Sequence, residues 1–314
     1  MATVLVTGGA GFIGSHICEK LLQKGYNVIC LDNLSSGNPQ NIEGCKNNKK
    51  FVFIKGDSNS LDLENVFKKN KIDFVFHYSY TMGNKVNIEE PTRVLNDVKG
   101  IQNIFELARK HDVKKIVYAS SSEVYGEPAE LPEREDGPVN PVVPYGSVKL
   151  LGEEFMKSYF QQYGLKGCAL RIFNTYGPRQ VTESTYSFVV GNFIQQVLAN
   201  KQPTIFGDGN QTRDFLYVDD NVEAAMHALE SDKVNGKSLN VAKGERITIK
   251  DLADKIIKIS GKKMSPTFMP FRKHEILHRW ADVSRMKSLL NFEPKIKLEE
   301  GLKRTMDWYK SLKN

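Results

Sequence analysis

Short apolar runs alternate with amphipathic segments over the first half of the chain. The runs lie at 4–6, 26–31, 50–55, 73–77, 115–119 and 168–173, and segments with apolar positions at helical spacing lie at 15–24, 61–70, 94–111 and 145–163. Short continuous apolar runs are typical of strands buried on both faces. Strands that alternate with helices predict a parallel sheet with right-handed crossovers and helices on both faces.

The regular alternation of apolar runs and amphipathic segments ends after Gly177-Pro178. Helices are predicted at 187–200, 222–230, 249–259 and 298–310, with a short strand at 215–218, whereas the polar stretch 33–50 reads as loop. We therefore predict an α/β fold: a Rossmann-type doubly wound parallel sheet with a smaller, partly interleaved C-terminal substrate domain. The sheet domain would comprise 1–175 joined by about 214–242, and the substrate domain 176–213 and 243–314.

A glycine turn joins the first predicted strand to the first helix. In this turn Gly8 permits a sharp reversal, Gly11 lets a pyrophosphate approach the backbone, and Gly14 lets the helix pack closely on the sheet. The helix would direct its free N–H groups at phosphates. Asp32 ends the second strand near the ~20-residue spacing of the acid that binds the adenosine ribose. The sequence thus favours NAD over NADP, the alternative for Asp32 being a solvated loop residue.

Other polar residues follow predicted strands and are candidates for chemistry. Asp57 comes after the third strand, where it could contact adenine or cap the next helix; both interpretations stay open. The run 120–123, Ser-Ser-Ser-Glu, follows the fifth strand, and its hydroxyls could bond a reacting hydroxyl or cap a turn.

Tyr145 and Lys149 lie four residues apart near the start of a predicted helix, hence on one face. An ammonium beside a phenol stabilises the phenolate and lowers the phenol pKa. The pair could then take a hydroxyl proton while hydride leaves for NAD. The alternative is an unrelated surface tyrosine and lysine.

Composition narrows the class of protein. With 40% hydrophobic and 26% charged residues, the chain is typical of a soluble globular protein. Its apolar runs are too short to span a membrane, and a strand from Thr3 leaves no room for a signal peptide. Four cysteines without a CxxC pair predict reduced, buried thiols in a cytoplasmic protein. The net charge of +7 is spread along the chain without the basic stripe that nucleic-acid binding needs. A mild positive charge does suit small polyanionic ligands. We expect no bound metal.

These motifs together resemble the extended short-chain dehydrogenase/reductase family, specifically its nucleotide-sugar epimerases and dehydratases. The resemblance spans essentially the whole length, through TGGAGFIG, SSSEVYG, PYGSVK, RIFNTYGPRQ, FGDGNQTRDFLYVDD and ADVSR…LEEGLKRTMDWY. It implies an NAD cofactor, a nucleoside-diphosphate sugar substrate, and a homodimer through helices 97–111 and 145–163.

The resemblance also implies roles for single residues. Ser121, Tyr145 and Lys149 would form the catalytic triad, and Lys149 would also hold the nicotinamide ribose. Cofactor contacts would come from Gly8, Gly11, Phe12, Ile13, Gly14, Asp32, Asn33, Asp57, Tyr145 and Lys149. Substrate contacts would come from Ser122, Asn174, Arg213 and Arg272, the arginines gripping the diphosphate. Arg213 beside Asp214 could instead form a local ion pair.

Several positions depart from the family pattern. Where the family has small residues after the histidine of the fourth strand, this chain has Tyr78-Ser79-Tyr80, which would reshape the pocket around nicotinamide and sugar. The run 97–101, Asp-Val-Lys-Gly-Ile, replaces a usual Asn-Val-x-Gly-Thr, and the residues after Asp57 also differ. These changes weaken any transfer of substrate identity.

The net reaction has several candidates that share hydride removal from carbon 4 of the sugar. We expect 4-epimerisation, which needs no further acid or base. Glu123 lies where family dehydratases and decarboxylases carry a glutamate, so a 4,6-dehydratase that uses Glu123 is the nearest alternative. Net oxidation to a 4-keto sugar is a third outcome. A non-catalytic NAD sensor is an alternative of another class, against which Ser121, Tyr145 and Lys149 argue.

Overall fold

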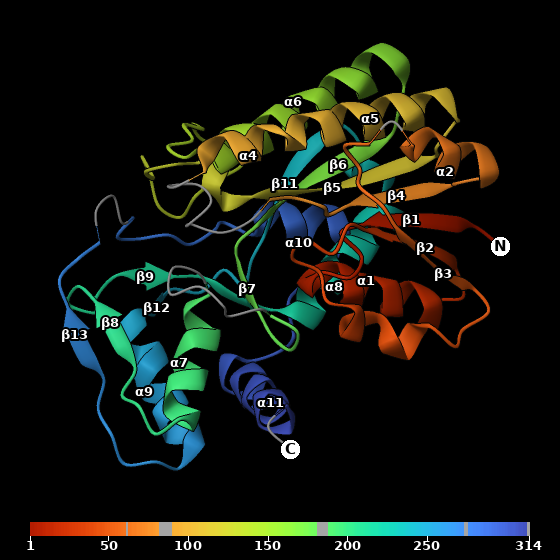
Figure 1. Ribbon diagram of the computed structural model, residues 1–314. Coiled ribbons are helices and arrows are strands. Elements are labelled where there is room, and N and C mark those ends of the chain that lie inside the picture. The colour runs from red at the N-terminus through yellow and green to blue at the C-terminus, as the bar shows by residue number, and fades with distance from the viewer. Residues whose placement is uncertain (61, 82–89, 181–187, 273–275, 313–314) are drawn as a thin grey trace.

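The computed structural model describes residues 1–60, 62–81, 90–180, 188–272 and 276–312. Its centre is a parallel sheet of seven strands, in the order β11-β6-β5-β4-β1-β2-β3 (Figure 1). The strands are β1 Thr3–Thr7, β2 Asn27–Asp32, β3 Phe51–Lys55, β4 Phe74–His77, β5 Lys115–Ser121, β6 Gly167–Ile172 and β11 Lys237–Val241. The predicted fold class, an α/β fold with a Rossmann-type parallel sheet, is confirmed.

Helices cover both faces of the sheet (Figure 1). One layer holds α2 Leu63–Lys69, α4 Pro91–Leu95, α5 Asp97–Lys110 and α6 Pro144–Tyr163, and the opposite layer holds α1 Phe12–Gln23, α8 Val218–Glu230 and α10 Ser284–Leu290. Helix α5 shows why these segments are helical: Ile101, Ile104, Phe105 and Ala108 recur at helical spacing and are all buried. The sheet is thus buried between two apolar layers, as the continuous apolar strands require.

A second group of elements lies beyond the carboxyl ends of the strands (Figure 1). It contains the helices α7 Val189–Leu198, α9 Ile249–Ser260 and α11 Leu298–Ser311, which pack on one another. Short strands pair in twos: β7 Asn174–Tyr176 with β10 Phe215–Tyr217, β8 Thr204–Phe206 with β13 Thr267–Met269, and β9 Thr212–Arg213 with β12 Ile247–Thr248. The described residues also form three 3-10 helices, η1 Pro39–Cys45, η2 Ser122–Val124 and η3 Asp232–Val234.

Some local predictions were wrong. The stretch 33–50 is not all loop, because η1 begins at Pro39 after Asn38, whose side chain accepts a hydrogen bond from the Gln40 N–H at 3.0 Å. Strand β11 was not predicted, and α8 begins at Val218, directly after β10. Residues 61 and 187, the first of two predicted helices, lie outside the described residues. The domain limits stay a prediction.

The strand order reverses between β1 and β4, which run side by side. Thr7 at the end of β1 and His77 at the end of β4 share a hydrogen bond of 2.7 Å between Oγ1 and Nδ1. In open α/β sheets ligands bind in the crevice at the carboxyl ends of the strands, where the order reverses. The fold therefore indicates a binding site at the carboxyl ends of β1 and β4.

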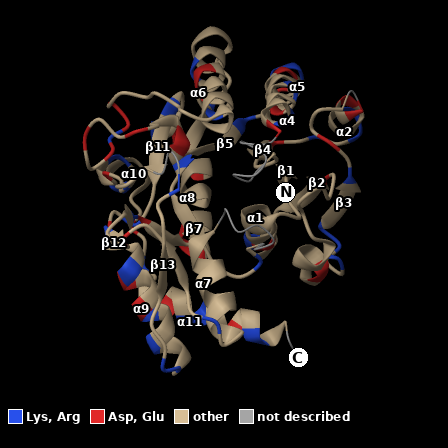
Figure 2. Ribbon diagram, turned by 60° about the vertical axis from the view of Figure 1, so that its left-hand side comes forward, with Lys and Arg blue, Asp and Glu red and all other residues tan. Residues whose placement is uncertain are grey.

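Two observations concern the whole molecule. All four cysteines are free and buried, as the sequence predicted. Acidic and basic residues are interspersed on helices such as α9 and α11 (Figure 2). In the described part of the chain, none of the helices has the length and apolar character needed to cross a membrane.

Candidate active site

The glycine turn after β1 makes a cradle that only glycine fits. Gly8 has a φ of +69°, and a Cβ there would lie 2.5 Å from the Tyr78 carbonyl oxygen. A Cβ on Gly14 would lie 2.1 Å from the Gly8 carbonyl oxygen, so α1 packs directly on the turn. Gly11 caps α1 without a side-chain hydrogen bond, which leaves the first helical amides to a ligand. These features fit a dinucleotide pyrophosphate at Gly11, Phe12, Ile13 and Gly14.

The acids predicted to bind the adenosine lie at the ends of β2 and β3. The Asp32 carboxylate is buried and accepts backbone N–H bonds from Ala10 at 2.9 Å and Leu34 at 2.8 Å. Asp57 accepts a bond from the Asn33 side-chain amide at 2.8 Å, so these two predicted cofactor residues meet. Asp57 does not cap the next helix, because Asp62 is the residue before α2. The backbone bonds of Asp32 fix the orientation of its carboxylate at the strand end.

Ser121, Tyr145 and Lys149 converge at the end of β5. Ser121 is the last residue of β5, and its side chain is hydrogen-bonded to that of Tyr145. Tyr145 and Lys149 lie one turn apart near the start of α6, with the Lys149 ammonium nitrogen 5.2 Å from the centre of the Tyr145 ring. The ammonium donates to the Ala119 carbonyl at 2.6 Å, which anchors α6 to β5. The fold thus brings the three predicted catalytic residues together.

The electrostatics of this cluster differ from the sequence prediction. Burial raises the pKa of Tyr145, and although the Ser121 hydrogen bond lowers that pKa, Glu123 and Asp97 raise it further. Burial also holds the pKa of Lys149 well below its usual value, against the opposite influence of Asp97 and Glu153. The lysine alone therefore does not make the phenol acidic in this chain, because desolvation weakens both charged forms. A further positive charge beside Tyr145 is needed.

The two unusual tyrosines after β4 occupy different places. The Tyr80 ring lies against the Lys149 ammonium, and its centre is 5.1 Å from that of His77 and 5.8 Å from that of Tyr118. Tyr78 points into the core, where burial raises its pKa and its hydroxyl has no partner among the described residues. Tyr80 is therefore the one that shapes the environment of Lys149.

Arg279 is a residue of this site that sequence reasoning missed. It is buried, and its guanidinium donates to Glu123 Oε1 at 2.6 Å and to the Gly126 carbonyl at 2.6 Å. Glu123 and Ser122 belong to η2, which follows β5 directly, and the Ser122 carbonyl accepts a bond from the Tyr125 N–H. No local signal marks Arg279, because its partner lies 156 residues earlier in the chain.

Of the predicted diphosphate residues, Asn174 begins the short strand β7, Arg213 ends β9, and Arg272 follows β13. The Asn174 side-chain amide donates to the Asp214 carbonyl at 3.4 Å, and Arg213 donates to the carbonyls of Thr212 at 2.9 Å and Leu277 at 3.2 Å. Asp214 is buried and accepts bonds from the N–H groups of residues 243, 244 and 281. The Arg272 guanidinium lies 3.9 Å above the Phe206 ring. Backbone carbonyls thus hold the Arg213 guanidinium, and an aromatic ring holds that of Arg272.

Comparison with known proteins agrees with this geometry. The family model described as "NAD dependent epimerase/dehydratase family" matches residues 4–242. A putative UDP-glucose 4-epimerase of Methanocaldococcus jannaschii is 39% identical over 310 residues, which are 98% of each chain. The structure of a UDP-glucose 4-epimerase from Thermotoga maritima with UDP-glucose is 34% identical, covers 99% of this chain and 100% of its own, and superposes with a TM-score of 0.93.

A further solved relative carries both a cofactor and a substrate. It is the UDP-glucuronic acid 4-epimerase of Bacillus cereus in complex with UDP-glucuronic acid and NAD, 34% identical, with 99% of each chain covered and a TM-score of 0.90. The family model covers well over half of the chain, and the relatives match it almost end to end. This chain belongs to the NAD-dependent epimerase/dehydratase family.

Proposed function

We propose that this protein is an NAD-dependent 4-epimerase of a UDP-sugar. The main observation behind the proposal is that Ser121, Tyr145 and Lys149 converge at the carboxyl end of β5. The glycine turn follows β1 at the same end of the sheet. The uridine base follows from relatives named as acting on UDP-glucose and UDP-glucuronic acid. Asn174, Arg213 and Arg272 would hold the nucleoside diphosphate of the substrate, as the family resemblance implies.

NAD would lie along the carboxyl ends of β1 to β4. The glycine cradle and the first turn of α1 would hold its pyrophosphate, and Asp32, Asn33 and Asp57 would face the adenosine. A carboxylate at Asp32 repels the 2′-phosphate of NADP. The chemistry that NAD supplies when bound is reversible acceptance of a hydride, and its oxidised ring adds the positive charge that Tyr145 requires.

Within this site the chain moves one proton. Tyr145 takes the proton of the sugar hydroxyl at carbon 4, and Ser121 holds that hydroxyl through its own side chain. Lys149 stays anchored to the Ala119 carbonyl and stabilises the phenolate as the proton transfers. Tyr145 returns the proton after the 4-keto sugar has presented its other face. Four-epimerisation needs no other acid or base.

Glu123 is the residue on which the dehydratase alternative depends. One of its carboxylate oxygens is held by Arg279 at 2.6 Å, and the side chain is 35% exposed. Because the Arg279 guanidinium holds Oε1, a base for the proton at carbon 5 would have to act through Oε2. This contact supports the epimerase over the dehydratase.

The test is product analysis of the purified enzyme with UDP-glucose, UDP-glucuronic acid and UDP-N-acetylglucosamine. We expect a 4-epimer of unchanged mass from one of them. The Tyr145→Phe variant should lose a factor of roughly 10² to 10⁴ in kcat, the usual contribution of a general base. Products lighter by water, carbon dioxide or two hydrogens would contradict 4-epimerisation. Unchanged turnover in Tyr145→Phe would reject the catalytic role of Tyr145.

We also propose a cytoplasmic homodimer. Helices α5 and α6 lie together on the outside of the sheet, where the family resemblance expects the subunit contact (Figure 1). Four free, buried thiols agree with a reducing compartment. Light scattering should give a mass twice the 35.5 kDa of one chain. A mass equal to one chain at micromolar concentration would contradict the dimer.

A further inference from the structure

A second glutamate, Glu133, lies near Arg279 and, unlike Glu123, is buried. Glu133 is 3% exposed, and its Oε1 lies 3.5 Å from Arg279 Nε. Both carboxylate oxygens of Glu133 and the Nε of Arg279 are buried without a hydrogen-bond partner among the described residues. A buried carboxylate without hydrogen bonds is costly to ionise. One guanidinium thus stands between two carboxylates, and only Glu123 is firmly bonded to it.

The backbone around Glu133 is fixed, so this arrangement is built into the fold. The Glu133 N–H donates to the Trp280 carbonyl at 2.9 Å, and the Asp282 N–H donates to the Glu133 carbonyl at 2.8 Å. The Asn240 side chain donates to the same carbonyl at 2.9 Å. The segment that carries Glu133 is therefore tied to the segment that carries Arg279, and the two side chains stay within reach.

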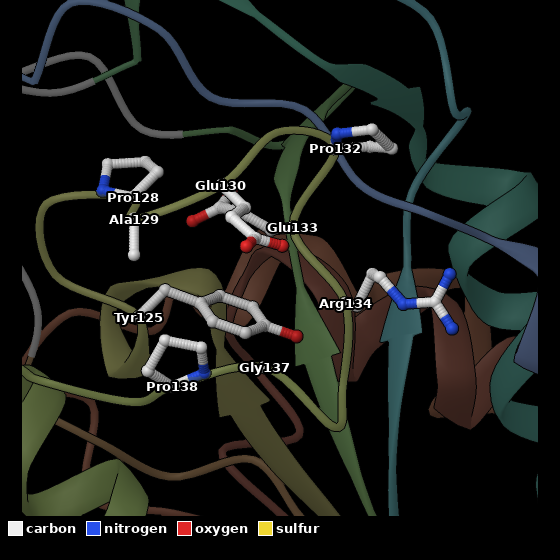
Figure 3. A pocket seen from close by; sticks show the side chains of 9 residues that line it. All are labelled: Tyr125, Pro128, Ala129, Glu130, Pro132, Glu133, Arg134, Gly137 and Pro138. Carbon is white, nitrogen blue, oxygen red and sulfur yellow. The ribbon is translucent and has the colours of Figure 1, made fainter.

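A small cavity lies beside Glu133. The cavity has a volume of about 30 Å³ and is bounded by Tyr125, Glu130, Glu133 and nearby prolines. Figure 3 shows the carboxyl groups of Glu130 and Glu133 directed into the same space over the Tyr125 ring, with Arg134 turned away. This space admits about one water molecule. Glu133 thus lies next to a small void, while both of its carboxylate oxygens stay buried.

We propose that Glu133 is a positioning residue of the active site, which shares the Arg279 guanidinium with Glu123 and so sets the position of the Glu123 carboxylate and how fully its charge is compensated. When Glu133 is protonated, Arg279 belongs to Glu123 alone. When Glu133 is ionised, it draws the guanidinium through Nε and weakens the bond to Glu123. The uncompensated charge of Glu123 then opposes ionisation of Tyr145, whose pKa Glu123 raises.

The charges around Glu133 place its titration in the neutral range. Burial raises its pKa to about 7, against the lowering effect of Arg279. Glu123 and Asp214 raise this pKa, Arg213 lowers it, and Glu130 faces the same cavity. The effect on the catalytic step rests on the proposed epimerase function, but the sharing of Arg279 can be measured on the protein alone.

The first experiment needs no substrate. Arginine Nε resonances are followed by NMR from pH 5.5 to 8.5, and that of Arg279 is assigned with the Arg279→Lys variant. We expect the Arg279 signal to shift with a midpoint near pH 7 in the wild type and to stay constant in Glu133→Gln. Glu130→Gln is the matched control, because it alters the same cavity, and it should leave the midpoint in place. A constant Arg279 signal in the wild type would overturn the proposal.

The second experiment reads the active site. The measured quantity is the kcat of Glu133→Gln divided by the kcat of the wild type. This ratio should be near one at pH 6 and should rise about threefold to tenfold by pH 8.5. Such a rise corresponds to a change of about half to one unit in the pKa of Tyr145. The ratio for Glu130→Gln should stay flat. A merely structural role of Glu133 would change both ends of the pH range alike, and that result would also overturn the proposal. If no UDP-sugar turns over, the proposed function fails, and the NMR titration still decides whether Arg279 is shared.

Discussion

The buried ion pair between Arg171 and Glu153 offers a test of what holds the active site in place. Arg171 of β6 donates to Glu153 of α6 through Nη2 at 2.7 Å and Nε at 3.0 Å, and both side chains are less than 7% exposed. Ser120, the neighbour of Ser121, donates to the same carboxylate. The pair therefore links the sheet, α6 and the catalytic serine.

The Arg171→Met variant removes the cation and leaves the Glu153 charge buried. Breaking such a pair on one side costs about 3–5 kcal/mol. Unfolding entropy of about 2.1 cal/mol/K per residue gives ~0.66 kcal/mol/K for this chain. The expected fall in Tm is therefore roughly 5–8 °C. Replacing both partners, as in Arg171→Met with Glu153→Leu, should recover most of that loss, because neither charge then remains buried.

The assay is thermal unfolding followed by circular dichroism, together with kcat on the active UDP-sugar. The surface pair of Lys250 and Asp254, about half exposed, supplies the control: Lys250→Met should leave Tm unchanged within error. We expect Arg171→Met to lower kcat as well, because Ser120 loses its fixed acceptor. A fall in Tm below about 1.5 °C, or a double variant no better than Arg171→Met, would refute the reasoning.

Three further predictions concern the cofactor, the core and pH. Asp32→Asn should reduce the preference for NAD over NADP at least about tenfold in calorimetric Kd values, because the repulsive charge is lost; an unchanged preference would reject the role of Asp32. Gly152→Ala should cost about 1–3 kcal/mol in urea unfolding, since its Cβ would lie 2.0 Å from the Tyr118 hydroxyl, whereas Gly44→Ala, with 3.7 Å to its nearest neighbour, should be tolerated. Glu133 binds a proton more tightly when folded, with a pKa of about 7 against 4.5, so its contribution to stability falls by up to about 3 kcal/mol as pH rises from 4.5 to 7. Calorimetry should accordingly find Glu133→Gln more stable than the wild type at pH 8 and similar to it near pH 4.5, and equal Tm values at pH 8 would contradict this.

The parts of the fold that sequence could predict are those governed by local patterns. The glycine turn after Val4–Val6 has steric requirements that only glycine meets, and the apolar runs matched the strands of the sheet. Strand β11 was not predicted because Lys237, Ser238 and Asn240 interrupt its apolar pattern. Asn240 is nevertheless fully buried, since Tyr125 and two backbone carbonyls satisfy its side chain. Only the tertiary structure supplies those partners.

The candidate site divides in the same way. Tyr145 and Lys149 are close in sequence, so their helical spacing predicted the pairing. Arg279 and Glu133 are distant from each other, and nothing in the residues around them indicates a shared contact. In the chain alone burial raises the pKa of Tyr145, against the direction expected from the neighbouring lysine. Desolvation depends on the whole fold, and a motif carries no information about it.

The most direct test of the central claim is proton NMR of the reaction in D₂O, with UDP-glucose, UDP-glucuronic acid and UDP-N-acetylglucosamine as substrates. A hydride that leaves and returns at carbon 4, with Tyr145 moving only the hydroxyl proton, predicts a 4-epimer that keeps protium at carbons 4 and 5. Deuterium at carbon 5 of the product would show that a second base acts there, and the account of Tyr145 as the only proton-transfer group would be contradicted.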